Sequence, residues 1–162
     1  MAWVLLLVPF AALGLITSVD ELYYHRKRGL PKWERLGHPL DLLAFVFCWA
    51  WMATHDFNDT NLCIYAALTS FACILSTKDE WVHAELCPPG EQWMHSMMFM
   101  FNPVVFFCGG YIWACGPNTL AVPATHWEET AQFLHPLIYL NTIGYIFLLI
   151  YNFTYWHLRG DD

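Results

Sequence analysis

The chain has 162 residues, a formal net charge of −7 and a strongly apolar composition. Hydrophobic residues make up 57% of it, aromatic residues 18% and charged residues only 13%. These values exclude an ordinary soluble domain, and the acidic balance argues against nucleic acid as a partner. They predict a single all-α domain over residues 1–162, embedded in a lipid bilayer.

Five apolar runs follow one another and predict five transmembrane helices. The shorter runs fall below the roughly 20 residues that a helix needs to cross the hydrocarbon layer, so their helices must extend into polar residues at their ends. Strands are excluded because the runs lack the strict alternation of a membrane barrel. The first run shows no cleavage pattern of a signal peptide, and we expect a retained helix. The runs are residues 3–16, 42–53, 62–75, 93–115 and 133–156.

The first predicted unit is a helical hairpin over about residues 2–56. Residues 18–38 read SVDELYYHRKRGLPKWERLGH, in which Asp-Glu is followed by His, then by a Gly/Pro loop, and then by Glu-x-x-x-His. Residues three or four apart share one face of a helix. The pairs Glu21/His25 and Glu34/His38 should therefore each aim a carboxylate and an imidazole in one direction.

The second predicted unit repeats this pattern over about residues 60–115. Residues 76–95 read STKDEWVHAELCPPGEQWMH, with CPPGE as the loop and with the pairs Glu80/His83 and Glu91/His95. We interpret the chain as two tandem hairpins related by a pseudo-twofold axis. Asn102-Pro103 is expected to break the second helix of this unit and to open a cavity beside the polar residues.

The last predicted element is a fifth helix over about residues 128–157, which has no counterpart in the repeat. Its expected role is lateral support, or one wall of a cavity.

Charge placement predicts the orientation. With five spans, every basic residue falls in the first loop, the third loop or the C-terminal tail, all on one side, and the positive-inside rule makes that side cytoplasmic. The N-terminus should lie outside and the C-terminus inside, with the repeated motif on the cytoplasmic side. The basic residues are Arg26, Lys27, Arg28, Lys32, Arg35, Lys78 and Arg159.

The repeated motif predicts a metal site. Ionisable groups at the hydrocarbon boundary are costly unless they are paired, metal-bound or solvated, and solvated helix ends have no reason to repeat in spacing and residue type. Asp20, Asp41 and Asp79 are alternative ligands or partners that orient the ligands. The predicted ligands are Glu21, His25, Glu34, His38, Glu80, His83, Glu91 and His95.

The ligand types favour iron, with zinc or manganese as alternatives, because carboxylate and imidazole occur together without thiolate. The spacing Glu80-x-x-His83 resembles that of di-iron carboxylate bundles, in which two helices carry Glu-x-x-His. The other three pairs are spaced by four residues, and the chain has more histidines than that pattern. Two divalent ions are therefore expected.

Three functions are compatible with this pattern. The leading hypothesis is a membrane di-iron oxidoreductase of lipid metabolism that hydroxylates or desaturates a lipid-like or quinone substrate and takes electrons from a separate donor. A zinc-dependent hydrolase of a lipid is the first alternative. A divalent metal transporter or sensor is the second, although the expected midplane polar residues include no carboxylate. Haem ligation by His38 and His95 would leave the acidic residues unexplained.

Overall fold

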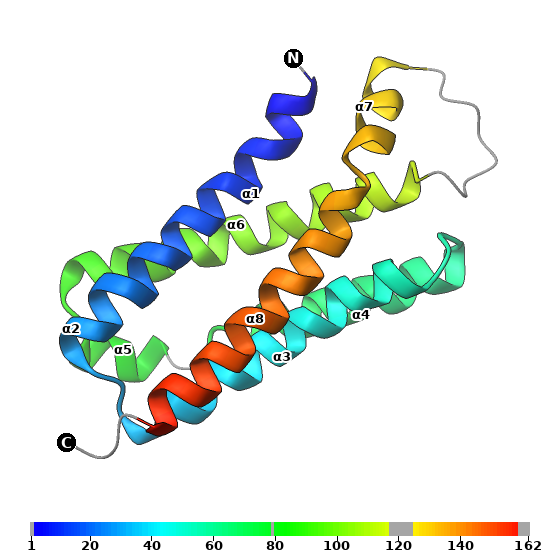
Figure 1. The fold of residues 1–162 in the computed structure, drawn as a ribbon. Coiled ribbons are helices and arrows are strands. Elements are labelled where there is room, and N and C mark those ends of the chain that lie inside the picture. Colours follow the sequence, from blue (N-terminus) through cyan, green and yellow to red (C-terminus); the bar gives the residue numbers. More distant parts are fainter. Residues whose placement is uncertain (1, 79, 117–124, 159–162) are drawn as a thin grey trace.

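The computed structural model describes residues 2–78, 80–116 and 125–158, and every element in these ranges is a helix. Figure 1 shows the helices as long, roughly antiparallel rods. In chain order they are α1 (Ala2–Val19), the π-helix η1 (Asp20–His25), α2 (Arg26–Arg28), α3 (Lys32–Thr54), α4 (Asp59–Leu75), α5 (Glu80–Leu86), α6 (Pro89–Ala114), α7 (His126–Leu134) and α8 (Pro136–Leu158).

Five helical stretches are long and apolar enough to cross a membrane, as the sequence predicted. The first of these stretches continues through its polar end, since α1 runs on through η1 and α2 before the chain turns. Gly29 makes that turn with a φ of 79°, a backbone conformation that glycine adopts without strain. The stretches are Val4–Arg28, Lys32–Thr54, Asp59–Leu86, Pro89–Ala114 and His126–Trp156.

Two helices differ from the prediction: the break expected at Asn102-Pro103 is absent, and the fifth helix, expected as one, is divided. Helix α6 runs unbroken through Pro103, where a proline removes a single backbone donor and a membrane helix tolerates the loss. The fifth helix is instead divided at His135 into α7 and α8. Pro136 is the first residue of α8, a position where its missing N–H costs no helical hydrogen bond.

The helices pack around a small aromatic core. Helix α1 contacts α6, α6 contacts α4, α4 contacts α3, and α3 makes its largest interface with α8. Trp49 and Ile112 are completely buried at the centre, and the Trp49 ring stands 5.8 Å from that of Phe106. A side chain at Gly109 would lie 2.8 Å from Trp49, so the glycine allows α6 to approach this ring.

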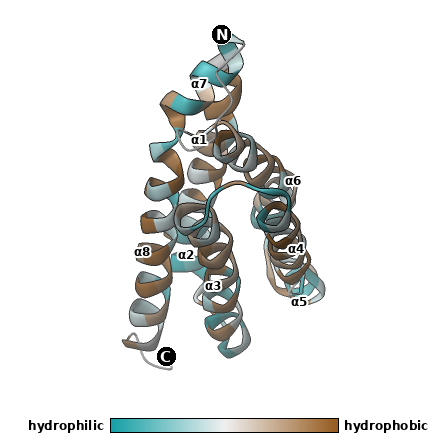
Figure 2. Ribbon diagram, turned by 90° about the vertical axis from the view of Figure 1, so that its right-hand side faces the viewer, coloured by the Kyte–Doolittle hydropathy of each residue, from teal (hydrophilic) through white to brown (hydrophobic). Residues whose placement is uncertain are grey.

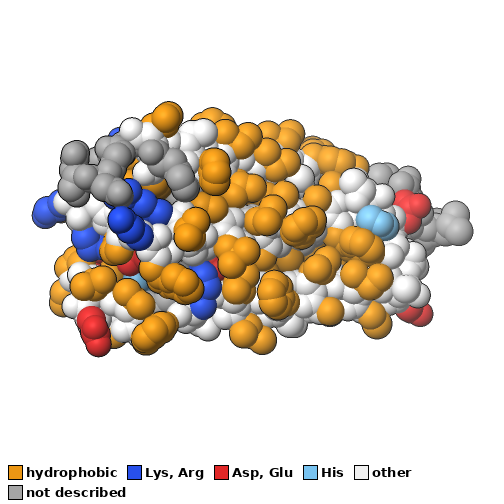
Figure 3. Space-filling model, turned by 90° about the horizontal axis from the view of Figure 1, so that it is seen from below, with side chains coloured by type: hydrophobic (Ala, Val, Ile, Leu, Met, Phe, Trp, Pro, Cys, Tyr) orange, Lys and Arg blue, Asp and Glu red, His pale blue; other side chains and the backbone are white. Residues whose placement is uncertain are grey.

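The outer surface is apolar over most of its length. Figure 2 colours α4 and α8 as largely hydrophobic, and Figure 3 shows hydrophobic side chains covering the middle of one face, with Lys and Arg toward one end. Phe107 and Phe133 are 77% and 81% exposed. Soluble proteins seldom expose apolar surface on this scale, so the surface fits a hydrocarbon environment.

Candidate metal centre

The polar residues of the repeated motif meet at one end of the helix bundle, where α2 and α5 lie (Figure 1). They come from four elements: η1 carries Asp20, Glu21 and His25, and α3 carries Glu34 and His38 in its first two turns. Helix α5 carries Glu80 and His83, and α6 carries Glu91 and His95. All eight predicted ligands, together with Asp20, thus lie in one cluster.

Four histidines form a ring in this cluster. In ring order they are His25, His38, His83 and His95, and each shares a potential metal-binding group with the next. Ring centroids lie 4.7 Å apart for His25 and His38, 4.3 Å for His83 and His95, and 6.2 Å for His95 and His25. Imidazoles at these separations can serve one ion or two neighbouring ions.

A carboxylate lies beside each neighbouring pair of histidines. Within each group, one ligand atom per residue lies within 4.8 Å of all the others, so small side-chain rotations would bring them to about 2.1 Å from a shared ion. Two groups join residues of both predicted hairpins and two stay within one hairpin. The groups are Asp20/His25/Glu91/His95, Glu34/His38/His83, Glu21/His25/His38 and Glu80/His83/His95.

Two glutamates orient two of the histidines. Glu21 Oε2 lies 3.0 Å from Nδ1 of His25, and Glu80 Oε1 lies 3.4 Å from Nδ1 of His83. A carboxylate at Nδ1 favours the tautomer that leaves the lone pair on Nε2, as is usual for metal-bound histidines. The free Nε2 atoms then face other carboxylates: that of His25 lies 3.5 Å from Glu91, and that of His83 lies 3.4 Å from Glu34.

Several buried polar atoms of the cluster lack a hydrogen bond. Among the described residues, no partner in hydrogen-bonding geometry is found for Asp20 Oδ1, His25 Nε2, His83 Nε2 or His95 Nδ1. His95 Nε2 lies 3.2 Å from Asp20 Oδ1, but this contact does not have the geometry of a hydrogen bond. Leaving a buried polar atom unpaired costs about 1–3 kcal/mol, so several at one place call for a ligand. The donor set and these atoms fit a metal ion.

Arg28 forms ion pairs with two glutamates, one in the first turn of the second helix of each predicted hairpin. Its guanidinium donates to Glu34 at 2.7 and 3.3 Å and to Glu91 at 2.7, 3.2 and 3.3 Å. Both carboxylates are completely buried. The sequence identifies Arg28 only as a basic loop residue, because nothing in its spacing indicates a contact with α6.

Helix α8 closes one side of the cluster. The indole N–H of Trp156 donates to Glu21 Oε1 at 3.0 Å, and Trp156 is 1% exposed. Arg26 donates to the Tyr151 hydroxyl at 3.2 Å and lies over the Tyr155 ring. These contacts join residues more than a hundred positions apart, and the sequence alone gave no signal for them. The expected role of the fifth helix as a cavity wall is consistent with them.

The remaining acidic candidates divide into two cases. Asp41 lies outside the four groups found among the described residues and forms an ion pair with Lys78 at 2.6 Å. The prediction for Asp79 falls outside the residues that the structure describes. Cys87 is buried beside the cluster, and burial raises the pKa of its thiol to about 12. It belongs to none of the four groups found among the described residues.

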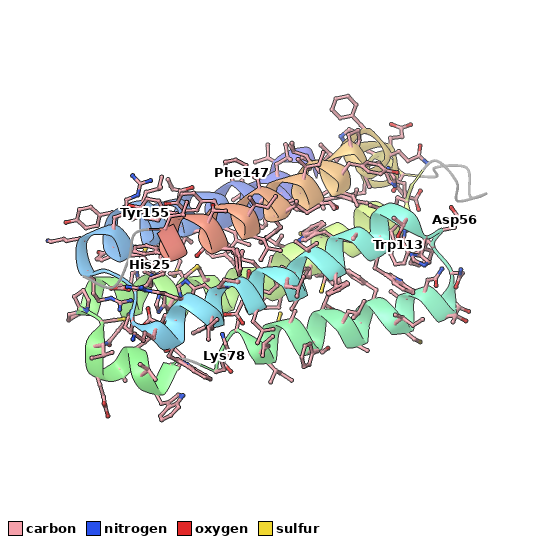
Figure 4. All side chains as sticks on the ribbon, turned by 60° about the horizontal axis from the view of Figure 1, so that its bottom comes forward. His25, Asp56, Lys78, Trp113, Phe147 and Tyr155 are labelled. Carbon is pink, nitrogen blue, oxygen red and sulfur yellow. The ribbon has the colours of Figure 1, made fainter. Side chains whose placement is uncertain are left out.

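A cavity of about 120 Å³ opens from the histidine ring into the bundle. His25, His38, His83 and His95 line its polar end. Phe45, Phe99 and Leu148 line its apolar part, and the buried amides of Asn102 and Asn152 also face it. Figure 4 shows His25 at this end of the bundle, far from Asp56 and Trp113 at the other.

A scan against protein-family models, a search of curated proteins and a search of solved structures all returned no match. The function must therefore be inferred from the cluster itself.

Proposed function

We propose that this chain is an integral-membrane metalloenzyme whose histidine ring holds two metal ions at the cytoplasmic boundary of the bilayer, and that the ions are iron. The observation that carries the proposal is the ring of four histidines, three of them buried and His38 partly buried, with a carboxylate beside each neighbouring pair. Polar atoms that lack hydrogen bonds converge in the same ring.

The order of residues around the ring supports the duplicated hairpin. Under the predicted repeat, His25 corresponds to His83 and His38 to His95, and these partners occupy opposite places in the ring. The same correspondence relates the group Glu21/His25/His38 of the first hairpin to the group Glu80/His83/His95 of the second. A pseudo-twofold axis through the ring would produce this pattern, and it would give two equivalent ion positions.

The two groups that join the hairpins are the proposed ion positions. Asp20, His25, Glu91 and His95 would hold one ion, and Glu34, His38 and His83 the other. Glu21 and Glu80 would orient His25 and His83 through Nδ1, and Arg28 would balance the charge of Glu34 and Glu91. Asp20, which the sequence predicts only as an alternative ligand, is one of the ligands in this proposal.

The proposed reaction is oxidation of a C–H bond in a lipid-like or quinone substrate. Iron bound to mixed carboxylate and imidazole ligands would supply oxygen activation. Hydroxylation consumes one O₂, two electrons from a separate donor and two protons, and it releases one water. Phe45, Phe99 and Leu148 in the cavity would hold the apolar substrate beside the ring and exclude bulk water.

Metal analysis of the protein, purified in detergent after expression with iron, tests this proposal. We expect about two iron ions per chain and the near-ultraviolet absorption of carboxylate-bound di-iron centres. Bound zinc in place of iron would favour the lipid hydrolase, and metal uptake by proteoliposomes would favour the transporter. A protein that binds no metal would contradict the proposal.

Variants test the assignment of ligands. His25→Ala and His83→Ala should each lose metal, and Glu21→Ala should weaken metal binding by about 10- to 100-fold because it only orients His25. Glu129→Ala is the matched control, since Glu129 is an exposed carboxylate of α7 at the other end of the bundle. Equal metal loss in Glu129→Ala would show that the effect is unspecific.

A further inference from the structure

An apolar groove runs along the outside of the bundle between α1 and α8. Its volume is about 670 Å³, and its walls include Phe10, Leu13, Leu137, Leu140 and Phe147. Phe147 is 68% exposed, so the groove faces the surroundings of the bundle, which in the proposed function are the lipid tails.

The groove and the cavity at the histidine ring share part of their walls. Thr17, Glu21, Tyr145 and Leu148 line both spaces. Glu21 is one of the residues in the cluster, where it lies 3.0 Å from His25. At these residues the groove and the polar cluster are therefore separated by a single layer of side chains.

The length of the groove matches one lipid tail. Its lining extends from Phe10 to Leu22 on α1, a separation of 12 residues, and from Leu137 to Tyr151 on α8, a separation of 14 residues. At 1.5 Å per residue, these spans measure about 18 and 21 Å. One leaflet of a bilayer contributes about half of the 30 Å hydrocarbon thickness, so an extended acyl chain would fill the groove.

The polar end of the cavity selects the head group. Asn152 is 3% exposed and lines the cavity, and its Oδ1 accepts no hydrogen bond from any described residue. The amide oxygen of Asn152 can only accept a hydrogen bond. A hydroxyl head group could therefore donate to it, whereas an ionised carboxylate has no proton to donate.

We propose that the α1/α8 groove binds the tail of a single-chain lipid with an uncharged hydroxyl head group, and that the head group lies in the cavity beside Asn152. The inference rests on the proposed function, because it names the substrate class for the same metal centre. The lipid enters sideways from the bilayer, and its head reaches the ring before its tail is fully enclosed.

Photolabelling tests the groove. The probe is hexadecanol with a diazirine at mid-chain, incubated with the full chain in phosphatidylcholine nanodiscs. We expect labelling of residues 10–22 and 137–151 that saturates and is displaced by unlabelled hexadecanol. Palmitic acid, with the same tail and an anionic head, should compete at least tenfold more weakly. Equal competition by palmitic acid would overturn the head-group assignment.

Two glycines allow the groove to be filled without disturbing the bundle. A Cβ atom at Gly14 or Gly144 would meet no atom within 4 Å, and both residues line the groove. Gly14→Phe and Gly144→Phe should therefore fold normally and reduce saturable labelling at least tenfold. Ala66→Phe is the control, because Ala66 lines the separate groove between α4 and α6. Labelling that is unchanged in both glycine variants would overturn the proposal.

The head-group contact has its own variant. Asn152→Leu keeps the side-chain volume and removes the amide, so hexadecanol affinity should fall about five- to tenfold, as expected for one buried hydrogen bond. Metal content is measured on every sample. Saturable groove labelling of a chain without metal would support this inference and contradict the proposed function, whereas bound iron without saturable labelling would do the reverse.

Discussion

At the scale of single residues, Arg28 joins the two halves of the predicted ligand set. Its guanidinium forms ion pairs with two completely buried carboxylates, Glu34 of α3 and Glu91 of α6. Removing one partner of such a network leaves charges buried without compensation, which typically costs about 3–5 kcal/mol. Arg28 and the proposed metal ions act on the same carboxylates, so their effects on stability should depend on each other.

Arg28→Gln should lower the free energy of unfolding of the metal-free protein by about 3–5 kcal/mol. The loss should be smaller in the iron-loaded protein, because bound cations would then compensate Glu34 and Glu91. Titration with a denaturing detergent, followed by circular dichroism, measures both values. Lys27→Gln is the control: Lys27 is exposed and lies over the exposed ring of Tyr23 on the same helix, so it should change stability little. An equal loss in both metal states would contradict the proposed coupling.

Cys87 should not contribute to the metal centre, although it lies beside Glu91 in the cluster. None of the four potential metal-binding groups found among the described residues includes its sulfur. Its thiol is buried, and burial raises its pKa to about 12, so the free thiol reacts poorly with alkylating reagents. Cys87→Ser should therefore retain the iron content of the unsubstituted chain. Alkylation of Cys87 by iodoacetamide at pH 8 should be slow in the folded protein and become fast only after unfolding. Loss of iron in the serine variant would show that the thiolate is a ligand.

At the scale of elements, the π-helix η1 explains an irregularity of the repeat. Glu21 and His25 are four residues apart, whereas Glu80 and His83 are three apart. A π-helical turn accommodates one more residue than an α-helical turn, and such turns are frequent at functional sites. The turn over Asp20–His25 therefore presents Glu21 and His25 on one face, as the shorter spacing does in α5.

Deletion of Tyr23 should convert η1 into an ordinary α-helical turn with Glu and His three residues apart. Tyr23 is 54% exposed, so its side chain contributes little packing. The shortened chain should keep its iron, as measured by metal analysis after purification. Deletion of Leu36 in α3 is the comparison, since it also removes an exposed side chain but changes the register of Glu34 relative to His38. Iron loss of equal extent in both deletions would contradict this interpretation.

The helices could be predicted from the sequence better than their contacts. The five apolar runs, extended into polar residues at their ends, predict five spans. The spacing of Glu and His predicts which residues share a helix face. The ring order, by contrast, depends on how four elements pack. The contacts of Arg28 with Glu91 and of Trp156 with Glu21 join distant segments, and no periodicity encodes them. The division at His135 depends on the packing of α7 against α1 and α6.

At the scale of the whole molecule, the basic residues of α2 lie at the same end of an apolar bundle as the polar cluster (Figure 1), and Figure 3 shows Lys and Arg side chains toward one end. From the positive-inside rule we propose that this end faces the cytoplasm. Reducing conditions and electron donors are available there, which the proposed oxidation requires. The orientation of the chain in the membrane therefore connects the position of the basic residues with the proposed oxidation.

Fusion reporters should place the C-terminus and the α3–α4 loop on opposite sides of a bacterial inner membrane. Green fluorescent protein fused after Asp162 should fluoresce, because it folds in the cytoplasm, and alkaline phosphatase at the same position should stay inactive. Alkaline phosphatase inserted in the α3–α4 loop, after Asn58, should be active. The reversed result would place the histidine ring outside and remove its expected access to cytoplasmic electron donors.

The division of the ring between two hairpins has a consequence for biosynthesis. Helices α1 to α3 leave the ribosome first and bring Glu21, His25 and His38 together, but both groups that join the hairpins wait for His83 or His95. Until then Arg28 has only Glu34 as its partner, and Glu91 completes the pair when α6 arrives. Loading of the two proposed ion positions is therefore expected only after α6 has been made, although Glu21, His25 and His38 come together earlier.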